Sequence, residues 1–262
     1  NDTLNGGAGA DTLTGGTGTD EVTYTSDDAA VTVNLATQTA TDGTGDTDTL
    51  SSIENATGSG FNDTLTGSTG ANTLDGGAGN DTIGGHNGDD FLYGGEGDDI
   101  IDGGSHDDVI SGGLGNDTVT YSGFGNGVTV NLATGVATDG GGGIDTLSGI
   151  ENVIGTNADD TITGNGADNV FTGNDGSDRF ILGEGGGNDT VLGGAGGGWT
   201  DTIQLTNTDA SSVGAGWTVT LTTGSEVSDD GSTMTLTDDA AGTITLEDGS
   251  QIAFEGIENI QY

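Results

Sequence analysis

The stretch that decides the fold is residues 58–120, which reads GSGFNDTLT GSTGANTLD GGAGNDTIG GHNGDDFLY GGEGDDIID GGSHDDVIS GGLGNDTVT. It divides without a gap into seven nonapeptides, and glycine is the commonest residue at positions one, two and four. The sixth position is always a carboxylate or its amide, at Asp63, Asn72, Asp81, Asp90, Asp99, Asp108 and Asp117. This spacing predicts a ladder of metal-binding turns.

Each residue type in the nonapeptide has a physical role. Glycine accepts positive φ and leaves the backbone carbonyls uncrowded, while aspartate supplies a charged oxygen ligand. Position eight points inward and forms one aliphatic row per half-coil. That row is Leu65, Leu74, Ile83, Leu92, Ile101, Ile110 and Val119.

Two nonapeptides make one coil, so turns 18 residues apart stack on the same edge. One edge carries Asp63, Asp81, Asp99 and Asp117, and the other carries Glu54, Asn72, Asp90 and Asp108. A cation between successive turns converts the repulsion of their carboxylates into attraction. Where Asn replaces Asp, as at Asn72 and Asn169, the ligand is neutral and we expect a weaker site.

The composition demands such a counter-ion. The chain of 262 residues has 43 acidic residues, a single basic residue, 56 glycines and a net charge of -42, so self-repulsion opposes compaction. The same charge disfavours nucleic acid or an anionic membrane as a partner, and no stretch is apolar enough to insert into a membrane. Because cysteine is absent, hard oxygens are the plentiful donors, which favours Ca²⁺ over Zn²⁺.

A larger repeat of 97 residues aligns Asp20 with Asp117 and continues through two inserts of 34 residues, at 24–57 and 121–154. We expect the inserts to be longer coils of one solenoid spanning residues 1–198. Each insert has Ile-Glu-Asn close to its end, and the Glu54 or Glu151 of this triplet falls in register with the sixth position. Both readings of these glutamates stay open at this point, as substitute metal ligands or as solvated turn residues.

Other repeats flank this region. Candidate ligands before the first insert are Asp2, Asp11 and Asp20, and those after the second are Asp160, Asn169, Asp178 and Asp189. From residue 199 the pattern changes to alternating strands, for example at 217–221, 234–236, 244–246 and 252–254, which predicts a C-terminal β-sheet cap over 199–262. The cap closes with Gly256-Ile257-Glu258-Asn259-Ile260, a third copy of the insert ending. The chain opens within a nonapeptide, so we expect it to be part of a longer protein.

The nonapeptides resemble those of the RTX (repeats-in-toxin) family, which implies a right-handed parallel β-roll with calcium bound between its turns. The resemblance implies carbonyl ligands from positions two and four of one turn and positions one and three of the next. One implied site is Gly77, Gly79 and Asp81 with Gly94, Glu96 and Asp99, and its neighbour is His86, Gly88 and Asp90 with Gly103, Ser105 and Asp108. Neighbouring turns add Gly85, Asn87, Gly95, Gly97, Gly112 and Leu114.

The inserts and the end of the chain resemble the C-terminal region of large bacterial adhesins exported by type I secretion. The residues that carry this resemblance are VTVNLAT at 31–37 and 128–134 and the Ile-Glu-Asn endings. It implies a monomeric, non-enzymatic module that is secreted to the cell surface, meets the type I secretion machinery in transit, and folds in extracellular calcium. It also implies a secretion signal within residues 199–262.

Several alternatives remain. The chain could be the non-catalytic tail of a secreted protease or polysaccharide epimerase. Outward Thr rows could bind ice, although Asp75, Phe91, Tyr93 and Asp102 interrupt them. His86 and His106 could pair on a transition metal, although exposed turn positions explain them more simply. Carboxylate pairs such as Asp98–Asp99 resemble glycosidase acid/base pairs, but the second Asp already belongs to a metal turn.

Overall fold

A computed structural model describes residues 1–194, 197–206, 217–238 and 240–262. Strands and turns account for all regular structure in these residues, and none of them forms a helix that could cross a membrane. Contacts divide the chain into two compact units. Unit 1 consists of residues 1–120 and 141–150, and unit 2 of residues 121–140 and 151–262.

Unit 1 has two sheets, and the strands of residues 58–120 alternate between them along the chain. In the first sheet the hydrogen-bonded order is β1 (Thr3–Leu4), β3 (Glu21–Thr23), β7 (Asn55–Thr57), β9 (Thr73–Ala78), β11 (Phe91–Glu96), β13 (Val109–Leu114) and β17 (Ile144–Ser148). In the second it is β2 (Thr12–Thr14), β6 (Thr47–Ser51), β5 (Thr39–Thr41), β4 (Thr32–Asn34), β8 (Thr64–Thr66), β10 (Thr82–Gly84), β12 (Ile100–Asp102) and β14 (Thr118–Thr120).

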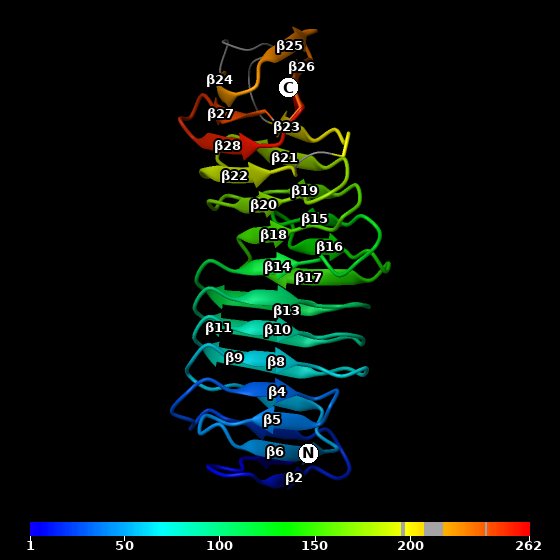
Figure 1. Cartoon of the computed structure of the whole chain (residues 1–262), viewed down its shortest axis with the longest axis vertical. Coiled ribbons are helices and arrows are strands. Elements are labelled where there is room, and N and C mark those ends of the chain that lie inside the picture. The colour runs from blue at the N-terminus through cyan, green and yellow to red at the C-terminus, as the bar shows by residue number, and fades with distance from the viewer. Residues whose placement is uncertain (195–196, 207–216, 239) are drawn as a thin grey trace. The chain divides into compact units, whose positions relative to one another are not determined.

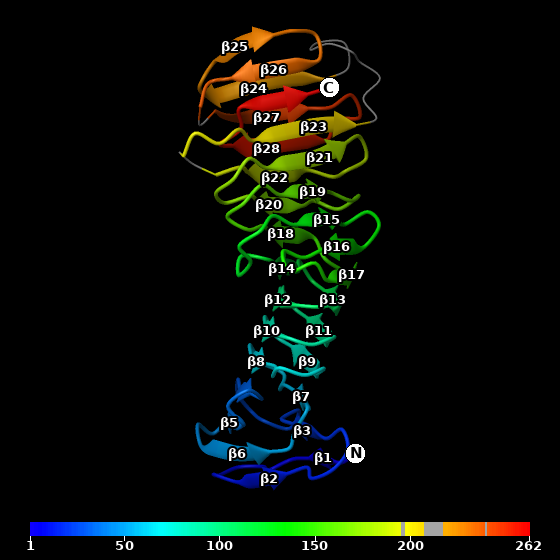
Figure 2. The same cartoon turned by 90° about the vertical axis from the view of Figure 1, so that its right-hand side faces the viewer.

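The coils of unit 1 pair in parallel with a register of one full coil. Ile83 pairs with Leu65 on one side and with Ile101 on the other, each 18 residues away. The strands of the nonapeptide block lie one beyond another in Figure 1, and β8, β10 and β12 face β9, β11 and β13 in Figure 2. The predicted inward row is confirmed, because all seven of its side chains are buried between the two sheets. The all-β roll expected from the repeats is therefore confirmed.

The first insert differs from the expected longer coil. Its strands β4, β5 and β6 form an antiparallel meander within the second sheet, where β4 pairs in parallel with β8 and β6 with β2. The connections at residues 35–38 and 42–46 are too short for a crossover between parallel strands, so they can only make hairpins. Val33, Ala40 and Leu50 point inward and continue the core.

Unit 2 repeats the two-sheet arrangement. The order of its first sheet is β16 (Val136–Thr138), β15 (Thr129–Asn131), β19 (Thr161–Thr163), β21 (Arg179–Gly183), β23 (Thr202–Thr206), β29 (Asn259–Gln261), β26 (Thr233–Leu236) and β25 (Glu226–Asp229). The order of its second is β18 (Asn152–Ile154), β20 (Val170–Thr172), β22 (Asp189–Leu192), β28 (Gln251–Glu255), β27 (Ala241–Thr245) and β24 (Thr218–Thr223). Two strands of the second insert, β15 and β16, also pair as an antiparallel hairpin.

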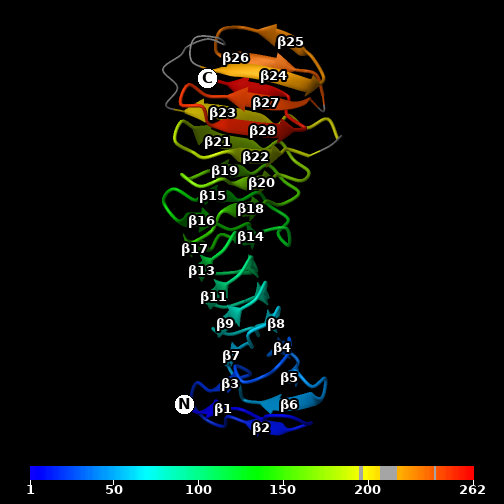
Figure 3. The same ribbon diagram turned by 90° about the vertical axis from the view of Figure 1, so that its left-hand side faces the viewer.

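The C-terminal strands extend the sheets of unit 2. Strands β23 and β28 pair in parallel with β21 and β22, and β29 pairs in parallel with β23. The outer strands β24, β25, β26 and β27 pair antiparallel with their neighbours (Figure 3). The rings of Trp217 and Tyr262 pack 4.9 Å apart between centroids and help to cover the end of the core. The four strands expected after residue 199 are present as β24, β26, β27 and β28. The domain boundary at residue 198 stays a prediction.

Candidate metal centre

A hydrogen-bonded ladder connects the sixth positions along one edge of unit 1. The backbone N–H of Asp63 donates to Oδ1 of Asp81 at 2.7 Å, the N–H of Asp81 donates to Oδ1 of Asp99 at 2.7 Å, and the N–H of Asp99 donates to Oδ1 of Asp117 at 2.9 Å. Each donor lies one coil before its acceptor. The sixth-position side chains are therefore stacked on one edge as predicted.

The same ladder runs along the other edge and through unit 2. The N–H groups of Asn72 and Asp90 donate to Asp90 and Asp108 at 2.7 and 2.8 Å. In unit 2 the corresponding pairs are Asp160 to Asp178 at 2.8 Å, Asp178 to Asp201 at 2.8 Å and Asn169 to Asp189 at 3.0 Å. In each pair Oδ1 of the acceptor carboxylate fixes the spacing of two coils.

The second carboxylate oxygen is left over. Oδ2 of Asp81, Asp90, Asp99 and Asp178 is buried and has no hydrogen-bond partner among the described residues. A buried carboxylate oxygen without a partner destabilises the fold, because it has lost its hydrogen bonds to water and makes none to the protein. These atoms fit a cation, which would compensate them.

A glycine opens a space beside each orphaned oxygen. A β-carbon added to Gly76 would overlap Oδ2 of Asp81 and lie 2.7 Å from the carbonyl oxygen of Gly94. One coil further, a β-carbon on Gly94 would overlap Oδ2 of Asp99 and lie 2.5 Å from the carbonyl oxygen of Gly112. A carboxylate and a carbonyl of the next turn thus converge on one small space, as the oxygen ligands of Ca²⁺ do.

Burial raises the pKa of these carboxyl groups. The pKa of Asp81 rises to about 6 through loss of hydration, with further contributions from the charges of Asp63 and Asp99. Burial likewise raises the pKa of Asp90 to about 6 and that of Asp178 to about 8. The metal-free fold therefore favours uncharged carboxyls, and a divalent cation would remove that preference.

The turn residues that the resemblance implies as ligands also meet on one edge. Gly95 pairs with Gly77, and the N–H of Gly79 donates to the Glu96 carbonyl at 2.7 Å. Gly95 and Gly97 have φ of 117° and 125°, and a β-carbon on either would overlap the carbonyl oxygen of Gly77 or Gly79. The structure thus brings the implied set together, while its binding of calcium stays a prediction.

The opposite edge has the same contacts despite its histidines. His86 adopts φ of 76° and its carbonyl accepts the N–H of Ser105 at 2.7 Å, while the N–H of Gly88 donates to the Ser105 carbonyl at 3.3 Å. Asn87 and Ser105 form a parallel bridge. The side chains of His86 and His106 are exposed, and Nδ1 of His106 lies 2.7 Å from the Ser105 carbonyl oxygen.

The other residues of 58–120 that the sequence predicts as ligands lie in the turns that carry the sixth-position aspartates. A β-carbon on Gly85 would overlap Oδ2 of Asp90, and one on Gly103 or Gly112 would lie 2.6 or 2.5 Å from Oδ2 of Asp108 or Asp117. Leu114 is 69% exposed, but its carbonyl accepts the N–H of Gly97 at 2.8 Å. The backbone of Leu114 is therefore held in the turn while its side chain points to solvent.

The two asparagine positions behave differently from the aspartates. Nδ2 of Asn72 donates to the carbonyl of Glu54 at 2.5 Å, and Nδ2 of Asn169 donates to the carbonyl of Glu151 at 2.8 Å. Each amide thus makes a direct contact across the coil gap. A neutral hydrogen bond joins the two coils at these positions.

Three buried aspartates in the ladder were missed in the sequence. The N–H of Asp11 donates to Oδ1 of Asp48 at 2.9 Å, and the N–H of Asp108 donates to Oδ1 of Asp145 at 3.1 Å. Asp201 occupies the same position after Asp178. The available signal was the Asp-Thr-aliphatic triplet, since residues 48–50, 145–147 and 201–203 repeat the Asp-Thr-Leu of 63–65.

The N-terminal candidates and the insert glutamate also join the ladder. The N–H of Asp2 donates to Oδ1 of Asp20 at 2.6 Å, and the N–H of Asp20 donates to Oε2 of Glu54 at 2.9 Å. Glu54 is half-buried. Its carboxylate thus takes the place of the next sixth-position aspartate.

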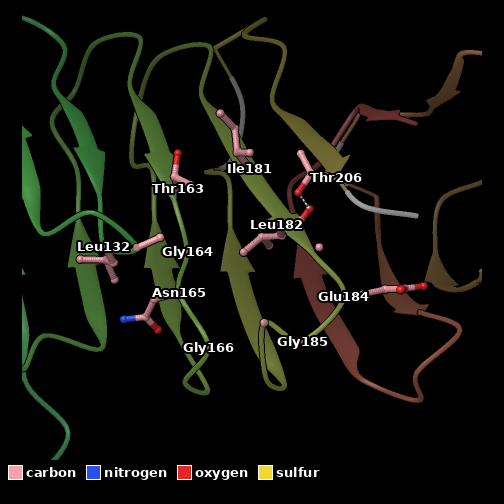
Figure 4. Close-up of a pocket in the computed structure, with 13 residues that line it drawn as sticks. Leu132, Thr163, Gly164, Asn165, Gly166, Ile181, Leu182, Glu184, Gly185 and Thr206 are labelled. Carbon is pink, nitrogen blue, oxygen red and sulfur yellow. Dashed lines mark hydrogen bonds between the residues drawn. The ribbon is translucent and has the colours of Figure 1, made fainter. Parts of the chain in front are cut away.

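No three His, Asp or Glu side chains gather into a metal-binding group among the described residues. A cation at these turns must therefore use backbone carbonyls as well as carboxylates. The open groove of about 480 Å³ in unit 2 is a different feature (Figure 4). Glycines and aliphatic side chains such as Leu132 and Leu182 form much of its wall, and Glu184 is the one titratable residue that lines it, so it lacks a carboxylate pair.

Comparison with protein-family models finds a match to this chain. A family model described as the RTX calcium-binding nonapeptide repeat (4 copies) matches residues 1–28, 57–92, 84–119, 154–186 and 185–198. These segments together cover just over half of the chain. No curated protein matches the chain. The matched segments contain most of the sixth-position aspartates and bind calcium at multiple sites in this family.

Proposed function

Because this chain belongs to the RTX family of calcium-binding nonapeptide repeat proteins, we propose that it is a structural module that folds on meeting extracellular calcium. The observation that carries this proposal is the row of buried Oδ2 atoms without partners, at Asp81, Asp90, Asp99 and Asp178. The net charge of -42 supports the same conclusion for the whole chain, because bound cations would reduce its self-repulsion.

The energy of calcium binding is sufficient to control folding. Extracellular calcium modules have dissociation constants of about 10⁻⁴ to 10⁻³ M. At about 10 mM calcium, a site at the tight end of this range stabilises the fold by roughly 2.7 kcal/mol, and at sub-micromolar calcium it contributes almost nothing. Several such sites are comparable with the whole stability of a domain, about 5–15 kcal/mol.

A calcium titration of the metal-free chain tests this function. We expect far-UV circular dichroism at pH 7.5 to show little regular structure in chelator and a cooperative gain of β-structure near millimolar calcium. Magnesium at the same concentration should be much less effective, because it holds its waters and demands a rigid octahedral geometry. A chain that is fully folded in micromolar calcium would contradict the proposal.

We further propose that the module is the non-enzymatic, C-terminal folding and export end of a large adhesin secreted to the bacterial surface. The repeated VTVNLAT segments at 31–37 and 128–134 and the closing strands of unit 2 support this context. The chain would pass through a type I secretion machinery unfolded and fold outside as a monomer. Export of a reporter fused to residues 199–262, compared with a fusion to residues 58–120, tests the position of the signal. Equal export of both fusions would contradict it.

A further inference from the structure

The Ile-Glu-Asn turn occurs three times and has a constant conformation. The residue before Ile has positive φ in each copy, 54° at Ser52, 57° at Gly149 and 66° at Gly256. The following Ile53, Ile150 and Ile257 are buried. These turns lie outside the segments that match the nonapeptide repeat. They are therefore a separate structural element whose role the repeat family does not assign.

In unit 1 this turn is hydrogen-bonded to Asp20, which lies in the last nonapeptide turn before the insert. The N–H groups of Glu54 and Asn55 both donate to the Asp20 carbonyl at 3.0 Å, and Oε2 of Glu54 accepts the N–H of Asp20 at 2.9 Å. Unit 2 repeats the arrangement. Glu258 and Asn259 donate to the Asp201 carbonyl at 3.2 and 3.0 Å, and Oε2 of Glu258 accepts the Asp201 N–H at 2.7 Å.

The turn reproduces the oxygen arrangement found between two nonapeptides. A β-carbon on Gly15 would overlap the Ser52 carbonyl oxygen and lie 2.6 Å from Oδ2 of Asp20. In unit 2 a β-carbon on Gly193 would overlap the Gly256 carbonyl oxygen and lie 2.7 Å from Oδ2 of Asp201. The carbonyl before Ile thus occupies the place that the first-position carbonyl of the next repeat has elsewhere.

The carboxylate of Asp20 gives an independent reason to place a cation in this space. Asp20 is 0% exposed, and its Oδ2 has no hydrogen-bond partner among the described residues. Its Oδ1 is already used by the N–H of Asp2 at 2.6 Å. The oxygen that remains is the one directed at Gly15 and Ser52, so a buried acceptor points into the space without a donor to meet it.

The other side of the turn is closed. The Glu54 carbonyl accepts the side-chain amide of Asn72 at 2.5 Å, which joins the turn to the following coil by a direct hydrogen bond. The cradle beside Asp20 therefore lies on one side of the turn only.

We propose that two of the three Ile-Glu-Asn turns, those of Glu54 and Glu258, each form a hybrid Ca²⁺ site with the aspartate to which they are hydrogen-bonded. In unit 1 its oxygens come from Asp20, the Ser52 carbonyl and the Glu54 carboxylate, and in unit 2 from Asp201, the Gly256 carbonyl and the Glu258 carboxylate. This proposal rests on the calcium-dependent function above. It adds sites at which a glutamate in a short turn replaces a complete repeat.

Calcium counting on charge-neutral variants tests the hybrid sites. Gln at position 54 or 258 can still accept the aspartate N–H, but it removes the negative charge. We expect Glu54→Gln and Glu258→Gln each to lose one bound calcium per chain in native mass spectrometry and equilibrium dialysis, and the double variant to lose two. Glu247→Gln is the matched control, because Glu247 is exposed in a hairpin turn and should keep every calcium.

A second variant guards against misfolding. Asp20→Asn keeps an oxygen for the Asp2 N–H and should lose the same calcium as Glu54→Gln, while hydrogen exchange in β9 to β13 stays unchanged. An unaltered calcium number in Glu54→Gln, Glu258→Gln and Asp20→Asn would overturn the hybrid sites. If the parent chain itself bound no calcium, the general function would fail instead, so the two failures are distinguishable.

Discussion

Substitution of Gly95 by alanine provides a sharp test of how closely the coils approach. Gly95 lies in the turn end of β11, its φ is 117°, and an added β-carbon would overlap the carbonyl oxygen of Gly77 in the coil before it. Relief of this overlap requires the two turns to separate. Separation would weaken the Gly79 N–H bond to the Glu96 carbonyl, which is 2.7 Å long.

The magnitude follows from three contributions. A non-glycine residue in this backbone region costs about 1–3 kcal/mol. Forcing an extra carbon into a packed contact costs about 1–3 kcal/mol more, and a weakened interturn hydrogen bond adds about 1 kcal/mol. We therefore expect Gly95→Ala to destabilise unit 1 by roughly 5 kcal/mol, within a range of about 3–7 kcal/mol. This is a large part of a typical domain stability of about 5–15 kcal/mol.

Two control glycines separate these contributions. Gly45 has φ of 90° with nothing near its added β-carbon, so Gly45→Ala should cost only the backbone strain, about 1–3 kcal/mol. Gly84 has neither positive φ nor a close neighbour, so Gly84→Ala should be neutral or stabilise by about 0.4–1 kcal/mol. Urea unfolding in saturating calcium, together with hydrogen exchange in β9 to β13, measures the series. Equal losses for Gly95→Ala and Gly45→Ala would refute the close approach of the turns.

Three further outcomes are expected. The folded pKa of Asp81, about 6, exceeds its unfolded value of about 4, so its contribution to metal-free stability is present below about pH 4 and lost as the pH rises through 6. Circular dichroism in chelator should thus show more β-structure at pH 5 than at pH 8, and the opposite trend would contradict this. Asn72→Asp replaces the amide that donates to the Glu54 carbonyl with a carboxylate. Calorimetric titration should then find one more bound calcium per chain, and folding should need a higher calcium concentration. An unchanged titration would contradict this prediction. Tyr24→Phe removes the hydroxyl that donates to Oδ2 of buried Asp48 at 2.9 Å, and it should cost about 1–3 kcal/mol in urea unfolding. A loss below about 0.5 kcal/mol would show that water replaces that donor.

Much of the fold follows from one strict period. Because every nonapeptide places an aliphatic residue at position eight and a carboxylate or amide at position six, the inward row and the stacked edges can be predicted from the sequence alone. Ile83 and Ile101 lie in register as expected. Strict repetition makes each local choice agree with its neighbours, which is why the prediction is reliable there.

The inserts escaped prediction for a physical reason. Their strands are as short as those of the coils, and only the length of the connections shows that they must turn back on themselves. Asp48 and Asp145 were missed because they belong to these strands and not to glycine turns, although each precedes a Thr and an inward Leu. The role of Asn72 was also hidden, since only the three-dimensional structure shows that its amide reaches the Glu54 carbonyl.

The split use of the aspartate oxygens has a consequence for ion exchange. Oδ1 fixes the spacing of successive coils through a backbone N–H, and this hydrogen bond does not use Oδ2. An ion can therefore leave one gap without sliding the strands past each other, a shift that would turn the aliphatic row of Ile83 and Ile101 outward. The strands thus keep their register while Ca²⁺ ions bind and dissociate. A site that has lost its ion can bind another without the strands having to pair again.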